Sequence, residues 1–179
     1  MDTTQGASAP RNPFTFTSPN EEFKVIFPSG CSKLVARSNE PDLFGGETWD
    51  DIIQVQYVTC DRFGEKGEGC SVSSTLNWHS REGEPADSGQ VIAQVEKALQ
   101  QFGVQVLRQK SVRKEFGNST VIEGVDVHAK NPELPGEVWI RGLLVDADIH
   151  IMIAWNEDGG LWDDPEYHAF FNSFQPFLD

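Results

Sequence analysis

Alternating hydrophobic and polar positions mark a series of strands along the chain. Between residues 22 and 27, Phe23, Val25 and Phe27 fall on one face, which predicts a half-buried strand that ends at Pro28. Similar strand patterns occupy residues 33–37, 52–60, 71–79, 104–115, 119–128, 137–145 and 150–155. The last two are separated only by a short Asp-Ala-Asp connection, which predicts an antiparallel hairpin.

Two segments instead show helical spacing. Asp87 or Ser88 can cap the first helix, and Gly103 stands where a left-handed residue ends it. Its apolar stripe comprises Val91, Ile92, Val95, Ala98, Leu99 and Phe102. In the second helix Asp164 caps and Pro165 takes the first turn, and the stripe comprises Tyr167, Phe170, Phe171 and Phe174. Because each stripe needs a covering surface, the pattern predicts an α+β fold, a twisted antiparallel sheet with a central and a C-terminal helix packed on it.

Length and composition fit a single domain. The chain has 179 residues and a mass of 20.0 kDa, and it contains no internal repeat. Residues 1–20 are mostly small and polar, so they are predicted to form a flexible N-terminal tail before an α+β domain at 21–179. Such a start is typical either of a segment that follows a removed signal or lipid anchor, or of a frayed terminus. No stretch approaches the roughly 20 apolar residues that span a bilayer, so we expect no membrane insertion.

The charge excludes one class of partner and favours another. The formal net charge is -14, and the single basic run at 108–114 is short. Nucleic acid and anionic lipid repel such a surface, so we expect no nucleic-acid binding. Acidic residues gather late, between 146 and 166, where no Lys or Arg occurs. This stretch favours a cation or a basic protein partner.

Three cysteines bear on the compartment. Cys60 and Cys70 flank a glycine-spaced loop between two predicted strands, so a hairpin would bring both sulfurs together as a disulfide. That bond favours an extracytoplasmic location, periplasmic or secreted. The alternative is a cytoplasmic protein with reduced cysteines. Cys31 is then left as a buried free thiol, and zinc is not expected because no CxxC is present and the four histidines are scattered.

The order of elements resembles that of a known family. A leading strand FKVIFPSG precedes the amphipathic helix, followed by the meander GEVWIRGLLVDADIHIMIAWN and the closing segment DPEYHAFFNSFQPF. Over residues 20–177 this is similar to the PsbP-like superfamily. The resemblance implies an α-β-α sandwich and a non-enzymatic binding or assembly role, and it transfers no site residue.

Two sets of candidate site residues follow from the residues themselves. Calcium needs several converging oxygen ligands, for which the sequence offers Asp146, Asp148, Glu157 and Asp158. The alternative is that these residues serve turns, in which Asp and Gly are common. Exposed aromatic residues with acidic neighbours suit a basic peptide or a sugar, and Trp49 and Trp162, the latter beside Asp163, have this arrangement. The alternative is that each tryptophan is buried against the edge of the sheet. No other cofactor is expected.

Three functional hypotheses remain. The first is a non-catalytic extracytoplasmic binding or assembly module that acts on a protein partner through an acidic, aromatic-dotted surface. It rests on the absence of catalytic motifs such as GxSxG or a phosphate-binding glycine loop, on the predicted disulfide and on the order of elements. The second is a carboxylate- or metal-dependent hydrolase that uses the stretch 146–166. The third is a cytosolic chaperone-like adaptor for a secreted client, which would have three free thiols.

Overall fold

The computed structural model describes residues 12–18, 23–31, 34–38, 54–64, 67–76, 87–115, 121–145 and 148–176. Its strands are β1 (Phe14–Thr17), β2 (Phe23–Phe27), β3 (Leu34–Ser38), β4 (Gln54–Asp61), β5 (Glu68–Leu76), β6 (Gln105–Glu115), β7 (Val121–Lys130), β8 (Glu137–Val145), β9 (Asp148–Asn156) and β10 (Gln175–Pro176). The helices are α1 (Ser88–Phe102) and α2 (Pro165–Ser173), and a short 3-10 turn, η1 (Arg62–Gly64), follows β4.

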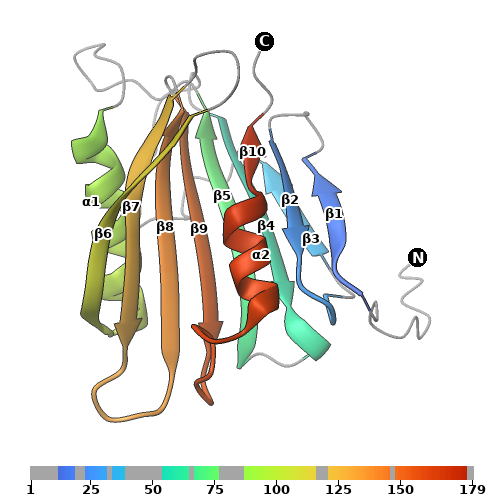
Figure 1. Cartoon of the computed structure of the whole chain (residues 1–179), viewed down its shortest axis with the longest axis vertical. Coiled ribbons are helices and arrows are strands. Elements are labelled where there is room, and N and C mark those ends of the chain that lie inside the picture. The colour runs from blue at the N-terminus through green and yellow to red at the C-terminus, as the bar shows by residue number, and fades with distance from the viewer. Residues whose placement is uncertain are drawn as a thin grey trace.

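Seven strands form one antiparallel sheet in the order β3-β4-β5-β9-β8-β7-β6, seen face-on in Figure 1. This confirms the predicted α+β class. The expected hairpin between β8 and β9 is present, with Val145 opposite Asp148. The expected β4–β5 hairpin is present too, with Cys60 opposite Cys70. A smaller antiparallel sheet, β1-β2-β10, lies beside the large one.

Helix α1 covers one face of the large sheet. Its N-cap is Asp87, whose side chain accepts from the amides of Gly89 and Gln90, and it ends at Gly103 in the left-handed conformation, as predicted. Its buried residues contact the strands β7, β8 and β9. They are Val91, Val95, Ala98 and Leu99. Each such side chain contributes roughly 1.5–3 kcal/mol when fully buried, so this stripe holds the helix on the sheet.

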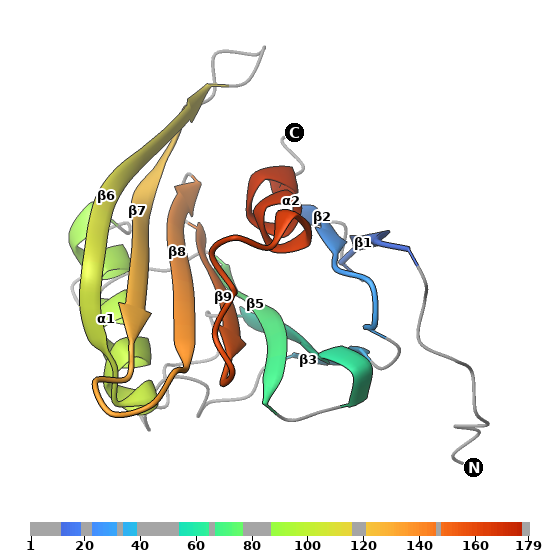
Figure 2. The same cartoon turned by 60° about the horizontal axis from the view of Figure 1, so that its bottom comes forward.

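Helix α2 and the small sheet lie on the opposite face, as Figure 2 shows in a view toward the lower end. The side chains of β8 and β9 alternate between the two faces, so Ile149, Ile151 and Ile153 point toward α1. Trp139 and Met152 belong to the core under α2. A ring contact with centroids 4.1 Å apart joins Trp139 to Phe171 of α2. Sequence alternation thus produces two cores on the two sides of one sheet.

Two sequence expectations differ from this structure. β1 lies within residues 1–20, which were predicted as a tail, because Phe14 and Phe16 alternate on one face and contact Phe27 of β2. Ile92 and Phe102 belong to the predicted stripe of α1, yet they are 40% and 37% exposed. They lie at the margin of the stripe, where the sheet no longer covers the helix.

The described part of the chain includes no helix that has both the length and the apolar character needed to cross a membrane.

Candidate functional site

The predicted calcium ligands do not meet at one point. Asp146 lies outside the described residues. Asp148 begins β9, whereas Glu157 and Asp158 follow its last residue. Nine steps of extended chain separate Asp148 from Glu157, which is roughly 30 Å. One cation therefore cannot contact both ends, and this corrects the predicted four-residue site.

The predicted aromatic surface is also arranged differently. Trp49 lies outside the described residues. Trp162 packs against the core under α2, and its ring stacks on His128 with centroids 5.1 Å apart. Asp163 is exposed beside it. Trp162 is thus a partly buried packing residue over His128 of β7, whereas Asp163 is exposed.

A groove at the lower end of the sheet in Figure 1 combines the features expected of a binding surface. It forms where the end of α1, the β7–β8 connection and the end of β9 meet, and its volume is about 480 Å³. Its apolar floor includes Phe102, Leu134 and Trp155. Leu134 is 61% exposed, so this floor faces solvent. We call this feature the acidic groove, because of the residues on its rim.

The rim carries three carboxylates. Glu137, Glu157 and Asp158 line the acidic groove, and among the residues that the structure describes no Lys or Arg lines it. Glu157 and Asp158 are exposed, and Glu137 is half-buried and accepts a hydrogen bond of 2.7 Å from the amide of Leu161. The groove thus combines an apolar floor with a carboxylate rim, and two of the three carboxylates, Glu157 and Asp158, are open to solvent.

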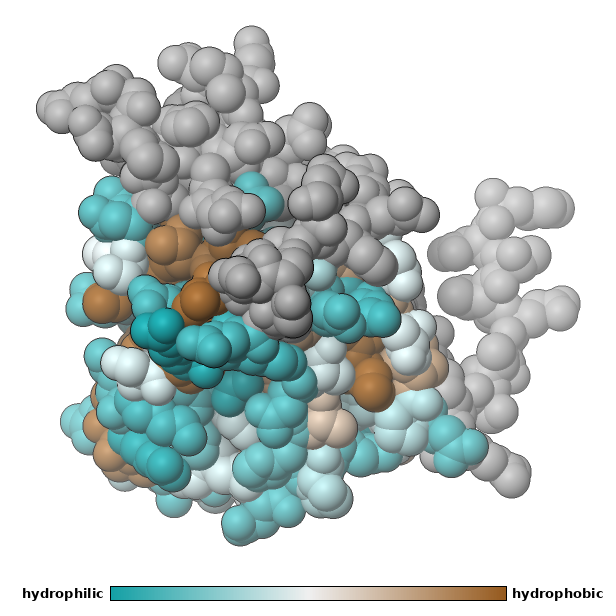
Figure 3. Space-filling view, turned by 45° about the horizontal axis from the view of Figure 1, so that its top comes forward, coloured by the Kyte–Doolittle hydropathy of each residue, from teal (hydrophilic) through white to brown (hydrophobic). Residues whose placement is uncertain are grey.

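A second depression, about 440 Å³, lies between β6 and α2 and has the opposite charge. It is lined by Lys110, Arg113 and Arg141 among others. Figure 3, in which the top of the molecule comes forward, shows hydrophobic and hydrophilic residues intermingled on the coloured part of that face. Two of its arginines already have partners. Arg141 Nε donates to Asp126 over 2.8 Å, and Arg113 Nη2 lies 3.2 Å from a carboxylate oxygen of Glu115. These pairs engage two of the four cations that line the depression, the others being Lys110 and Lys114.

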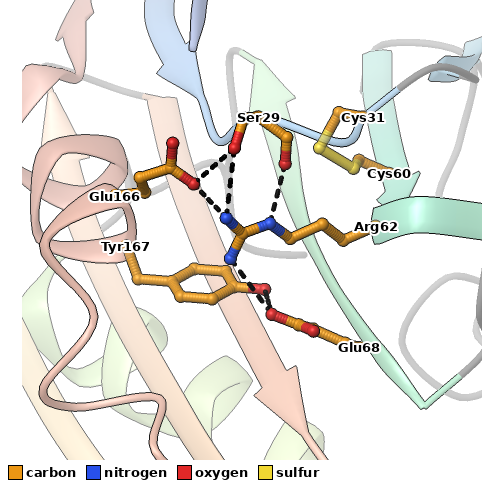
Figure 4. The surroundings of a disulfide bond; sticks show 7 residues. All are labelled: Ser29, Cys31, Cys60, Arg62, Glu68, Glu166 and Tyr167. Atoms are coloured by element: carbon orange, nitrogen blue, oxygen red, sulfur yellow. Dashed lines mark hydrogen bonds and ion pairs between the residues drawn. A yellow bond between two sulfur atoms is a disulfide. The ribbon is translucent and has the colours of Figure 1, made fainter. Parts of the chain in front are cut away.

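A buried arginine organises the region around the disulfide. Arg62, 6% exposed, follows β4 in the turn η1, and Figure 4 shows its guanidinium between the loop after β2 and helix α2. Its Nε donates to the carbonyl of Ser29 over 2.7 Å. It forms ion pairs with Glu68 at 3.1 Å, with Asp164 at 3.0 Å, and with Glu166. We call Arg62 with these three carboxylates the Arg62 cluster.

The surroundings fix the protonation states of Arg62 and of its neighbour Tyr167. Burial by itself lowers the pKa of Arg62, but hydrogen bonds to Asp164 and Tyr167 outweigh it and raise that pKa overall. Burial raises the pKa of Tyr167, whose hydroxyl donates to Glu68 over 2.9 Å. The guanidinium therefore stays charged and the phenol stays neutral. One positive charge ties the β4–β5 hairpin to the start of α2, so the cluster joins segments far apart in sequence.

The disulfide links Cys31 to Cys60, and Cys70 is a buried free thiol. This corrects the predicted Cys60–Cys70 pair. Cys60 and Cys70 do lie opposite each other in the hairpin, but the loop after β2 brings Cys31 to Cys60 with a Cα separation of 5.4 Å. That long-range approach is invisible in the sequence, because nothing local to Cys31 indicates which strand its loop meets.

Sequence reasoning missed both the acidic groove and the Arg62 cluster. Phe102 could have been recognised, because it is the last residue of its apolar stripe and a helix can extend there beyond the sheet that covers it. For Arg62 no sequence signal exists, since a single arginine in a hairpin turn is ordinarily solvated. Comparisons of the chain with protein-family models and with curated proteins find no match.

Proposed function

We propose that this protein is a non-catalytic binding or assembly module that acts on a protein partner through the acidic groove. The observation that carries the proposal is the solvent-facing apolar floor at Phe102, Leu134 and Trp155, whose described rim residues include three carboxylates and no Lys or Arg. Exposed apolar surface rimmed by polar residues is typical of interaction sites. The complementary partner segment is an apolar side chain flanked by Lys or Arg.

The other hypotheses receive less support from the geometry. A hydrolase based on residues 146–166 needs converging carboxylates, yet Asp148 lies at the opposite end of β9 from Glu157, and Asp164 and Glu166 are engaged by Arg62. A cytosolic adaptor with three free thiols is at odds with the Cys31–Cys60 bond. That disulfide supports an extracytoplasmic location, which we include in the proposal.

A relation to the PsbP-like superfamily is likewise part of the proposal. It is supported by the order of elements and by helices on both faces of an antiparallel sheet. Members of that group act mostly as binding or assembly factors, which agrees with the role argued from the groove.

The test is a titration followed by amide chemical shifts in NMR spectra. The probe is a blocked pentapeptide with leucine between two pairs of lysines, and two further peptides replace either the leucine by alanine or the lysines by glutamate. Burying the leucine contributes roughly 1.5–3 kcal/mol, so the alanine peptide should bind roughly tenfold more weakly or worse. Shifts should concentrate at the groove, and added salt should reduce the affinity.

A pair of matched variants separates the groove from general surface effects. Leu134→Ser removes an exposed side chain from the groove floor, and Ile92→Ser removes one from the other end of α1. Leu134→Ser should abolish the preference for leucine over alanine, whereas Ile92→Ser should leave it intact. Equal binding of the leucine and alanine peptides by the unmodified protein, or shifts away from the groove, would refute the proposal.

A further inference from the structure

All three cysteines of the chain gather at one point in the core. Cys31 comes from the loop after β2, Cys60 from β4 and Cys70 from β5, and they are 2%, 0% and 0% exposed. Their sulfur atoms all lie within 4.8 Å of one another. The free thiol of Cys70 is therefore a direct neighbour of the Cys31–Cys60 disulfide.

The backbone allows Cys60 two partners. It is bonded to Cys31 at a Cα separation of 5.4 Å. Cys70 stands directly opposite Cys60 in the antiparallel pairing of β4 and β5. Directly opposed residues in such a ladder have Cα atoms about 4.5–5.5 Å apart, which is inside the range that disulfides span. Neither pairing requires the strands to move apart.

We propose that Cys31, Cys60 and Cys70 form an intramolecular thiol–disulfide exchange site, in which Cys60 is the shared partner and Cys70 competes with Cys31 for it. The site is distinct from the acidic groove, and the inference does not depend on the proposed binding function.

The exchange is balanced without any added oxidant. The Cys70 thiol loses its proton, and the resulting thiolate attacks Sγ of Cys60. A new Cys60–Cys70 bond forms while the bond to Cys31 breaks, and the pair of electrons from that bond leaves with Cys31. The Cys31 thiolate then takes up a proton. One disulfide and one thiol are present before and after the step.

The surroundings of Cys70 keep this exchange slow at neutral pH. Burial raises the pKa of the Cys70 thiol, the Arg62 guanidinium acts to lower it, and Glu68 acts to raise it again. Tyr167 of α2 also faces this thiol. Because only the thiolate attacks, exchange should accelerate as the pH rises.

The choice of partner changes what the disulfide joins. The Cys31–Cys60 bond ties the loop after β2 to β4 of the large sheet. The same loop supplies the carbonyl of Ser29 to Arg62 and the carbonyl of Gly30 to the amide of Phe63. A Cys60–Cys70 bond would join only two strands that are already paired. Exchange would thus leave the loop held by these hydrogen bonds and by the chain that continues into β3.

Loop length favours the alternative pair in the unfolded chain. Cys31 and Cys60 are 29 residues apart, whereas Cys60 and Cys70 are separated by 10. Closure probability falls roughly as the 3/2 power of loop length, so the shorter loop should form about fivefold more often. Oxidation in denaturant therefore provides the Cys60–Cys70 isomer, from which the exchange can be approached in the opposite direction.

The experiment starts from both isomers under native conditions. Each is held without reductant or oxidant, with a metal chelator, at pH 7.5 and 9.5. Samples are quenched in acid, alkylated in denaturant and mapped by mass spectrometry. We expect the two isomers to converge on one ratio, faster at pH 9.5 and at a rate independent of protein concentration. Retention of both starting pairings at pH 9.5 would overturn the proposal, as would conversion whose rate rises with protein concentration.

Two variants keep the result interpretable. In Cys31→Ser the remaining cysteines should oxidise to the Cys60–Cys70 disulfide in the folded protein, which reduces the thiol count from two to zero. In Cys70→Ser the Cys31–Cys60 bond should persist at both pH values. A folded Cys31→Ser protein that keeps two thiols after oxidation would show that the site cannot form the second bond, and the proposal would be wrong.

Discussion

Replacing the buried Arg62 with methionine should strongly destabilise the fold. The substitution keeps an apolar stem but removes the cation from three carboxylates, Glu68, Asp164 and Glu166. The Arg62 side chain is 8% exposed and its partners are 21%, 27% and 25% exposed, so water screens the repulsion only in part.

The magnitude follows from this geometry. Removing one partner from a buried ion pair costs about 3–5 kcal/mol, and the partial exposure of the carboxylates favours the lower end, about 3 kcal/mol. For a domain of this size each 1 kcal/mol shifts the melting temperature by about 2–4 °C, so Tm should fall by about 6–12 °C. Glu68→Gln should cost much less, because it leaves Arg62 with two carboxylates and relieves part of their mutual repulsion.

Arg113 offers a matched control. It also lies between two carboxylates, Glu115 at 3.2 Å and Glu123 at 3.7 Å, but its side chain is 62% exposed. Exposed pairs contribute about 0–1 kcal/mol, so Arg113→Met should be nearly neutral.

The assay is urea unfolding of the disulfide-intact proteins at pH 7, followed by circular dichroism and extrapolated to zero denaturant. If Arg62→Met and Arg113→Met unfold within 1 kcal/mol of each other, the Arg62 cluster does not stabilise the fold as argued.

Two further predictions concern the sheet. Burial lowers the pKa of His150 to about 3, whereas an unfolded histidine titrates near 6.5, so protons bind the unfolded state first and stability falls as the pH drops from about 6.5 toward 3. As the pH falls through this range, the unfolding free energy of the wild type should fall more steeply than that of His150→Asn, by up to about 1.4 kcal/mol per pH unit. Parallel curves for the two proteins would contradict the lowered pKa of His150. At Gly142 an added Cβ would lie 2.7 Å from Val91 and 2.8 Å from Val95, so Gly142→Ala should cost about 1–3 kcal/mol in thermal or urea unfolding. Gly136→Ala, whose Cβ would come no closer than 3.6 Å to its neighbours, is the control and should lie near the wild type.

The core of the sheet could be read from the chain because its signals are local. Alternation over the segments that form β7, β8 and β9 sets which side chains face each core, and the caps at Asp87 and Asp164 begin both helices as predicted. The short connection between β8 and β9 specifies their pairing. Each of these signals depends on residues within about ten positions of one another.

The binding groove and the cysteine pairing required the tertiary structure. Phe102 and Leu134 are both apolar, and the sequence does not show that they face solvent. They do so because they lie where α1 ends, in the groove that Glu157 and Asp158 also line. The expected cation site failed for the same reason, since carboxylates close in sequence were carried to opposite ends of β9.

Periodicity and capping therefore determined the elements, their class and their buried faces, because those properties arise from the geometry of a single strand or helix. The identity of the partner of Cys60, the burial of Arg62 among three carboxylates and the assembly of the acidic groove were decided by packing between distant segments. Such contacts depend on how the loop after β2 and the start of α2 meet the β4–β5 hairpin, and no local pattern encodes that meeting.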